Sequence, residues 1–232
     1  MLPIAILAGG YGTRLGEIGR HIPKSLVQVG GVPFIDLQLD LLERAGYRKV
    51  VLCVSQKAEL LIDHLSKRYS SGLEIKYSFD GPFQLGTGGS VKNALPLLGS
   101  KFALIYGDSY LPIDYSLVEK DFLKCNSLGL VTVYKNENKY VQSNLKIEGK
   151  YIAKYVKGDG KNLEYVDYGL SYWDAKVFLG ASLSDRFDLQ EVYSGLISKR
   201  ELHCFKVDQR FYEVGSIAGI EELTNFIGGK HD

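Results

Sequence analysis

The chain has 232 residues, 45% of them hydrophobic, which is enough for one large α/β domain or two small ones. Lys and Arg number 28 and Asp and Glu 27, so the net charge of +1 gives no basis for binding nucleic acid or an anionic membrane surface. The sequence has no run of about 18 apolar residues and no basic N-terminal segment with a cleavage site, so we expect neither a transmembrane helix nor a signal peptide. The three cysteines are widely spaced and fit neither a disulfide framework nor a zinc site, which predicts reduced thiols in a cytoplasmic protein.

The first half of the chain alternates strand-like runs with segments of helical periodicity. Residues 3–8 and 50–54 are apolar runs, typical of strands buried on both faces of a parallel sheet. Between them, apolar residues at helical spacing indicate a helix over 33–46. A second helix over about 57–66 and an alternating strand over 73–79 follow. This order predicts an α/β fold with a doubly wound, mostly parallel sheet.

The second half alternates apolar and polar residues more regularly, as an antiparallel extension would. The expected elements are an apolar strand at 102–106, a helix at 114–125, strands at 128–134, 143–147 and 151–156, a helix at 189–198, a strand at 201–207 and a helix at 218–226. No linker or charge run separates the halves. We therefore expect a single domain over 1–232 with two halves, 1–110 and 111–232.

The segment 7–24, LAGGYGTRLGEIGRHIPK, carries the strongest chemical signal. Glycines at a strand end let the backbone turn sharply and approach a ligand, and the nearby Arg14 and Lys24 supply the cations that a polyphosphate requires. The Walker A pattern is absent, and Leu15 stands where a dinucleotide-binding motif needs its third glycine. Without further evidence, an ordinary glycine-rich turn between a strand and a helix remains the alternative.

Two later stretches have a similar character. Gly86, Gly88 and Gly89 come directly before a helix, whose free N–H groups can bind an anion or lie against a flat base. Asp108 follows the apolar strand at 102–106, where open α/β sheets bind ligands, and a carboxylate there suits Mg²⁺. The alternatives are a plain glycine-rich turn and an Asp that caps the following turn.

The first motif as a whole resembles the signature of the sugar-1-phosphate nucleotidyltransferases, Gly-Gly-x-Gly-Thr-Arg-Leu followed by Pro-Lys. The matching residues here are Gly9, Gly10, Gly12, Thr13, Arg14, Leu15, Pro23 and Lys24. The later motifs extend the resemblance over nearly the whole chain. Within the family, the sequence is most similar to the short bacterial heptose-1-phosphate and mannose-1-phosphate guanylyltransferases. The resemblance implies a Rossmann-like mixed sheet and Mg²⁺ as cofactor.

The resemblance also implies roles for individual residues. Arg14 and Lys24 would be catalytic. The nucleotide-binding residues would be Leu7, Gly9, Gly10, Gly12, Thr13, Gly88 and Asp108, and the sugar-phosphate-binding residues would be Asn144, Lys157, Asp167 and Gly169. Asp108 and Glu213 would hold the metal, although relatives carry Asp where this chain has Glu213. For the residues of the second half, a solvated Lys, a strand-end Glu and turn-forming Asn or Asp residues are the alternatives.

The implied reaction converts an NTP and a sugar 1-phosphate into an NDP-sugar and pyrophosphate, by direct in-line attack and without a covalent enzyme intermediate. By resemblance, GTP with a heptose or mannose 1-phosphate is favoured, for surface polysaccharide precursors. UTP or CTP, another sugar or a non-sugar phosphate are the alternatives, as is a regulatory module that binds a nucleotide sugar without turnover. We expect no nucleic-acid or membrane partner, and the sequence does not indicate an oligomeric state.

Overall fold

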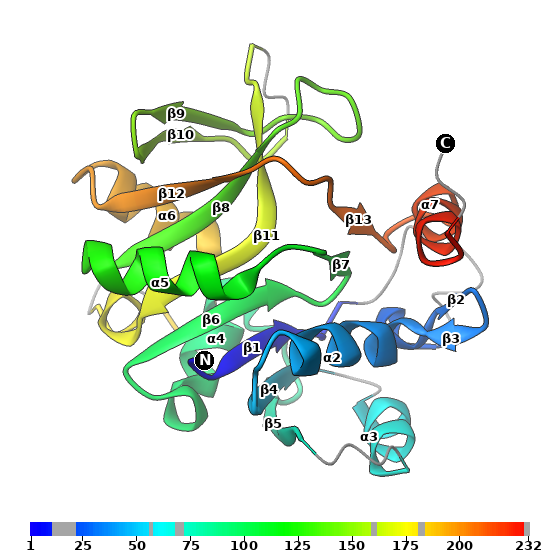
Figure 1. Cartoon of the computed structure of the whole chain (residues 1–232). Coiled ribbons are helices and arrows are strands. Elements are labelled where there is room, and N and C mark those ends of the chain that lie inside the picture. The colour runs from blue at the N-terminus through cyan, green and yellow to red at the C-terminus, as the bar shows by residue number, and fades with distance from the viewer. Residues whose placement is uncertain (11–21, 56–57, 68–71, 159–161, 181–183, 230–232) are drawn as a thin grey trace.

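The computed structural model describes residues 1–10, 22–55, 58–67, 72–158, 162–180 and 184–229. Across these residues one nine-stranded mixed sheet runs through the molecule, in the order β5-β4-β1-β6-β11-β8-β12-β10-β9 (Figure 1). Its strands are β1 (Ile4–Leu7), β4 (Lys49–Val54), β5 (Glu74–Phe79), β6 (Lys101–Tyr106), β8 (Gly129–Lys135), β9 (Leu145–Glu148), β10 (Tyr151–Tyr155), β11 (Tyr165–Asp174) and β12 (Leu202–Val207). The α/β class and the mixed sheet predicted from the sequence are confirmed.

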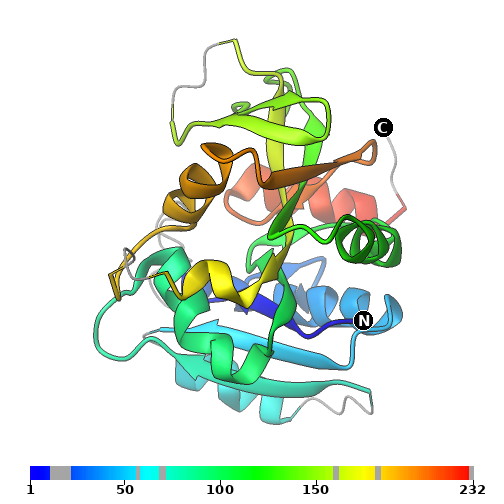
Figure 2. The same ribbon diagram turned by 90° about the vertical axis from the view of Figure 1, so that its left-hand side faces the viewer.

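Helices cover both faces of the sheet, as Figure 2 shows with α4 and α6 on one side and α5 on the other. The helices are α2 (Phe34–Arg44), α3 (Ala58–Ser66), α4 (Gly86–Leu98), α5 (Tyr115–Cys125), α6 (Leu189–Ile197) and α7 (Ile217–Ile227), with 3₁₀ turns η2 (Lys24–Leu26) and η3 (Ala175–Phe178). Two short ladders stand apart from the main sheet: β2 (Gln28–Val29) with β3 (Val32–Pro33), and β7 (Ser109–Tyr110) with β13 (Tyr212–Glu213).

The strands β5, β4, β1 and β6 are parallel, so their carboxyl ends lie along one edge of the sheet. The apolar runs of β1 and β4 are buried on both faces: alternate residues contribute to a core with α2, α3 and α5 and to a second core with α4 and α6. This double burial explains why the runs are continuous rather than alternating.

The strand β11 was not expected from the sequence. It lies in the middle of the sheet, antiparallel to both β6 and β8, and joins the parallel strands to the rest. Its register shifts between Asp167 and Ser171, and Gly169 there has a φ of +103°. This irregularity interrupts the period of two that identifies a strand in a sequence.

The remaining strands are mostly antiparallel, as predicted, but β12 runs parallel to β8. Residues 24–26 form the turn η2, directly before the short strand β2. Cys53, Cys125 and Cys204 are free thiols, in agreement with the sequence. In the part of the chain that the structure describes, no helix is both long and apolar enough to span a membrane.

Candidate active site

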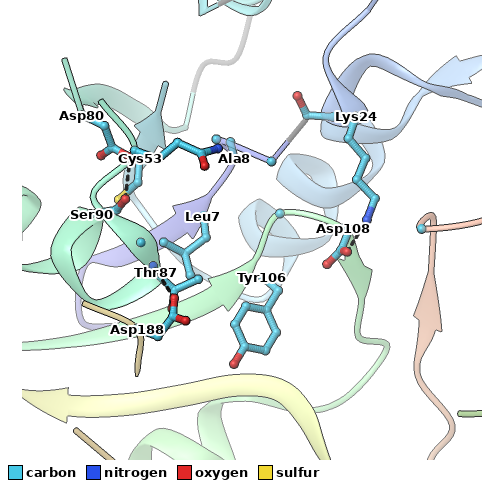
Figure 3. Close-up of a pocket in the computed structure, with 17 residues that line it drawn as sticks. Leu7, Ala8, Lys24, Cys53, Asp80, Thr87, Ser90, Tyr106, Asp108 and Asp188 are labelled. Carbon is cyan, nitrogen blue, oxygen red and sulfur yellow. Dashed lines mark hydrogen bonds and ion pairs between the residues drawn. The ribbon is translucent and has the colours of Figure 1, made fainter. Parts of the chain in front are cut away.

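A pocket of about 410 Å³ opens at the carboxyl ends of β5, β4, β1 and β6. Its walls come from the loop after β1, the start of α4, the turn after β6 and the residue before α6 (Figure 3). The lining residues are Leu7, Ala8, Gly9, Gly10, Lys24, Ser25, Cys53, Asp80, Gln84, Gly86, Thr87, Ser90, Tyr106, Gly107, Asp108, Asp188 and Gly215. The strand ends of a parallel sheet are where open α/β folds bind their ligands.

The glycine-rich stretch after β1 forms one wall. Leu7, Gly9 and Gly10 all line the pocket, and the Ser55 hydroxyl donates a 2.8 Å hydrogen bond to the Gly9 carbonyl oxygen. This bond ties the start of the loop to the end of β4. Gly12, Thr13 and Arg14, which complete the sequence motif, lie outside the described residues.

Lys24 and Asp108 meet at another wall of the pocket. The Lys24 ammonium forms an ion pair with Asp108 Oδ2, and both side chains are largely buried. Asp108 sits in the turn after β6, where the Gly107 N–H donates to the Leu7 carbonyl oxygen at 3.2 Å. A Cβ at Gly107 would overlap that carbonyl, so glycine is required for β1 and β6 to approach this closely.

The chemistry of this corner fits a Mg²⁺ site. Magnesium in phosphate-binding sites is held by one or two carboxylates together with substrate oxygens and water. Asp108 supplies one carboxylate that faces the pocket and already binds a cation, the Lys24 ammonium. Phosphate oxygens of a ligand in the pocket would complete the coordination.

Glu213, the second expected metal ligand, does not line the pocket. It lies opposite Ser109 in the β7–β13 ladder, and the next residue, Val214, donates its N–H to the Asp108 carbonyl oxygen at 2.9 Å. The ladder therefore brings the backbones of the two acidic residues side by side, while Gly215 is the residue of this segment that lines the pocket.

The N-terminus of α4 is occupied by the protein itself. The N–H groups of Gly88 and Gly89 donate to the Phe187 carbonyl oxygen at 3.0 and 3.1 Å. The sequence-based prediction that these N–H groups are free to bind a ligand is therefore wrong. Gly88 is packed against the Phe187 ring and does not line the pocket. The α4 residues that do line it are Gly86, Thr87 and Ser90.

Asp80 forms the end of the pocket beyond β5, on the far side from Lys24 and Asp108 (Figure 3). Its Oδ2 accepts a 2.6 Å hydrogen bond from the Ser90 hydroxyl, and its Oδ1 is buried with no partner among the described residues. Burial raises the pKa of the Asp80 carboxyl. The adjacent Cys53 thiol is neutral, because burial raises its pKa to about 12.

Two expected sugar-binding residues of β11, Asp167 and Gly169, form a hydrogen-bonded group with Asn144, which precedes β9, and with the hydroxyls of Tyr106 and Tyr193. Asn144 Oδ1 accepts from the Asp167 N–H, and Asp167 Oδ1 accepts from the Gly169 N–H, both at 3.0 Å. The hydroxyls of Tyr106 and Tyr193 each donate to Asp167 Oδ2 at 3.0 Å. Of these five residues only Tyr106 lines the pocket, so the three expected sugar-binding residues, Asn144, Asp167 and Gly169, lie next to the pocket rather than in it.

Lys157 reaches the pocket rim through Asp188. Its ammonium lies 2.8 Å from Asp188 Oδ2, and this contact lowers the pKa of the Asp188 carboxyl. Asp188 also begins α6, where it forms a capping box with Glu191. Asp followed three residues later by Glu is a sequence signal for a helix start, so the cap could be predicted from the sequence. The signal does not indicate that Asp188 lies at a pocket.

The fold and the pocket together define the class of protein. One cavity is lined by a glycine-rich strand end, a lysine and an aspartate that follows a strand, and this arrangement is typical of α/β proteins that bind a phosphorylated ligand. The profile of the family described as "Nucleotidyl transferase" matches residues 4–228. The chain belongs to this family and is a nucleotidyltransferase, as its motifs predicted.

Among the known proteins to which this chain is similar are two sugar-phosphate guanylyltransferases and one protein of solved structure. The D-glycero-alpha-D-manno-heptose 1-phosphate guanylyltransferase of Campylobacter jejuni is 27% identical over 213 residues, covering 90% of this chain and 93% of that protein. The mannose-1-phosphate guanyltransferase of Yarrowia lipolytica is 28% identical over 227 residues, and the match spans 90% of this chain but only 60% of that protein. The crystal structure of HddC from Yersinia pseudotuberculosis superposes with a TM-score of 0.84 at 25% identity, covering 98% of this chain and all of the other.

Proposed function

We propose that this enzyme transfers a nucleotidyl group from an NTP to a sugar 1-phosphate, giving an NDP-sugar and pyrophosphate. The observation that carries this proposal is the pocket in which the start of the glycine-rich motif, Lys24 and Asp108 lie together. A triphosphate needs backbone N–H groups, a fixed cation and a carboxylate for its metal ion, and this corner offers residues of each kind.

The reaction is a direct displacement at the α-phosphorus. An oxygen of the sugar phosphate forms the new P–O bond, while the bond to the bridging oxygen of the β-phosphate breaks and pyrophosphate leaves with the electron pair. Catalysis of this type depends on positioning and on charge neutralisation. Lys24 and Arg14 would neutralise the phosphates and the leaving pyrophosphate, and Lys157 would orient the attacking sugar phosphate.

Asp108 would hold Mg²⁺, with Glu213 proposed as a second ligand. When bound, the ion would supply charge neutralisation on the phosphate oxygens. In the described structure the Lys24 ammonium forms an ion pair with the Asp108 carboxylate. Binding of a metal–nucleotide complex would therefore free the Lys24 ammonium for a phosphate.

We propose GTP as the nucleotide and a heptose or mannose 1-phosphate as the acceptor, in line with the names of the similar guanylyltransferases. Asp80 lines the pocket, and we propose its carboxylate as the acceptor for guanine, the base that presents two adjacent donors, N1–H and the 2-amino group. Uracil presents its single ring N–H between two carbonyl oxygens, which a carboxylate repels.

We further propose that residues 1–232 act as one domain, with a Rossmann-like nucleotide-binding half at 1–110 and an acceptor-binding half at 111–232. Leu7, Gly9, Gly10, Gly12, Thr13 and Asp108 would bind the nucleotide, and Asn144, Lys157, Asp167 and Gly169 the sugar phosphate. The product would be a precursor for surface polysaccharides, made in the cytoplasm. Neither a nucleic acid nor a membrane is part of this proposal.

Initial rates of pyrophosphate release test the proposal, measured with Mg²⁺ across four NTPs and a panel of sugar 1-phosphates. We expect GTP with a heptose or mannose 1-phosphate to exceed the other pairs. A different preferred pair would keep the reaction and change the substrates. If no pair reacts although nucleotide binding is intact by calorimetry, a non-sugar acceptor or a binding module without turnover replaces the proposal.

A further inference from the structure

Gln38 is a polar side chain in the apolar side of α2. It is fully buried, and its neighbours on the buried side of this helix are Phe34, Ile35, Leu39 and Leu42. Removing a side-chain amide from water is unfavourable unless its polar atoms find partners. A buried glutamine in this position therefore needs a specific explanation.

Both hydrogens of the Gln38 amide are used on one turn. Nε2 donates to the Tyr106 carbonyl oxygen at 3.0 Å and to the Ser109 carbonyl oxygen at 2.9 Å. Oε1 has no partner among the described residues. The opposite orientation of the amide would place Oε1 against two carbonyl oxygens, so the donor pair fixes which way the amide faces.

The two carbonyls lie on either side of Gly107 and Asp108. The same turn is held from two further directions, by the Gly107 N–H bond to Leu7 and by the Val214 N–H bond to the Asp108 carbonyl oxygen. From α2, Gln38 binds the residues on both sides of Gly107 and Asp108. It therefore holds the backbone of the turn from which the Asp108 carboxylate faces the pocket.

The unsatisfied Oε1 argues against a purely stabilising role. A buried acceptor without a donor costs free energy, and an apolar side chain in the same place would avoid that cost. What an apolar side chain does not provide is the pair of donors that fixes the two carbonyls.

We propose that Gln38 is a positioning residue for Asp108, which sets the affinity of the pocket for a divalent cation with its nucleotide. The inference rests on the proposed function only in taking Asp108 as the metal ligand. Gln38 itself touches neither substrate nor metal. Outer residues that orient a metal ligand typically change metal affinity by about 10–100-fold when removed.

The test is Mn²⁺ binding followed by electron paramagnetic resonance, with and without GTP, for the wild type, Gln38→Leu and Leu42→Ala. Leu42 is fully buried on the same helix and makes no hydrogen bond to the turn, so we expect its truncation to destabilise the core and leave the turn unchanged. We expect Gln38→Leu to weaken Mn²⁺ binding by about tenfold or more, and to raise the Mg²⁺ concentration for half-maximal turnover by a similar factor. The KM for the sugar phosphate stays within about twofold. Leu42→Ala should lower the Tm and leave Mn²⁺ affinity unchanged.

Equal Mn²⁺ affinity in Gln38→Leu and the wild type overturns the inference, as does an equal loss in Leu42→Ala, which would make the effect one of general stability. Failure of the proposed function is a different result. If no substrate pair turns over, the Mn²⁺ measurement still decides whether Gln38 positions Asp108. If the wild type binds no Mn²⁺ with or without nucleotide, Asp108 is not a metal ligand and the inference falls, whatever the turnover assays show.

Discussion

Lys24 and Asp108, 84 positions apart in the chain, form an ion pair in the wall of the pocket. One comes from a short turn after the glycine-rich motif and the other from the end of β6. A carboxylate that is shared with a fixed ammonium is less available to a metal ion than a free one, because the two cations compete for the same oxygens.

Replacing Lys24 by Ala therefore has opposite effects on metal binding and on turnover. We expect Mn²⁺ to bind Lys24→Ala severalfold more tightly than the wild type in the absence of nucleotide, by on the order of 1 kcal/mol, because the competing ammonium is removed. We expect kcat to fall by about 100-fold, since a cation that stabilises the transition state is lost. Calorimetry and steady-state rates measure the two effects. Lys67→Ala, which removes an exposed ion pair on the α3 side, is the control and should change neither. Weaker Mn²⁺ binding in Lys24→Ala would contradict the competition.

Asp80 offers a test of nucleotide selectivity by exchange of donors and acceptors. An Asp80→Asn side chain keeps the shape but presents an N–H₂ group toward the guanine 2-amino group, so we expect GTP binding to weaken by about 10–100-fold, the 1–3 kcal/mol of a bidentate base contact. Xanthosine triphosphate carries a carbonyl oxygen at that position and should bind the variant better than the wild type. Titration calorimetry with both nucleotides measures the exchange, with Asp63→Asn as an exposed control. Unchanged preference in Asp80→Asn would remove Asp80 from the base site, and a change in KM for the sugar phosphate alone would place the acceptor there.

Lys157 and Lys154 form a matched pair for the acceptor site. Lys154 is exposed on β10, and Lys157 follows the same strand with its ammonium on Asp188 at the pocket rim. We expect Lys157→Ala to raise the KM for the sugar phosphate by about tenfold or more through loss of a charge-assisted contact, with little change in the KM for the nucleotide. Lys154→Ala should alter neither constant. Similar effects of the two substitutions would show that general surface charge, and not a specific contact, assists the acceptor.

Asp167 makes stability depend on pH in a defined direction. Burial raises the pKa of its carboxyl in the folded state above the unfolded value of about 3.9. Between these two values the folded state binds more protons, so the contribution of Asp167 to the free energy of unfolding falls as pH rises through the folded-state pKa. Asp167→Asn lacks this titration. Urea unfolding of both proteins from pH 4 to pH 7 should show the wild type losing stability relative to the variant as pH rises, and a gain would mean that the tyrosine hydroxyls outweigh burial.

The sequence predicts the parallel part of the sheet well because β1, β4 and β6 are buried on both faces and therefore appear as short continuous apolar runs. Local patterns alone predict that Gly9 and Asp108 follow strand ends, and the structure brings Lys24 and Asp108 into contact. The order of strands beyond β6 depends on long-range pairing, which local patterns do not show. The strand β11 itself is not predicted because the irregularity between Asp167 and Ser171 breaks its alternating pattern.

The residues that support the site were harder to predict than those that line it. In the sequence, Gln38 is indistinguishable from an ordinary polar residue of an amphipathic helix. The structure shows that its side chain faces inward and binds the turn between β6 and β7. The α4 N-terminus was predicted to be free, but the Phe187 carbonyl, about 100 residues away, accepts its N–H groups. Contacts of this kind leave no periodic signal in the sequence.

The most direct test of the proposed reaction is phosphorus NMR of the purified protein with GTP, Mg²⁺ and mannose or heptose 1-phosphate. We expect the signals of GTP and the sugar phosphate to decline together, while the two coupled signals of a nucleoside diphosphate sugar and the signal of pyrophosphate rise in equal amounts. The Asp108→Asn protein should form neither product under the same conditions. Release of inorganic phosphate from GTP with the sugar phosphate unchanged would contradict nucleotidyl transfer to this acceptor.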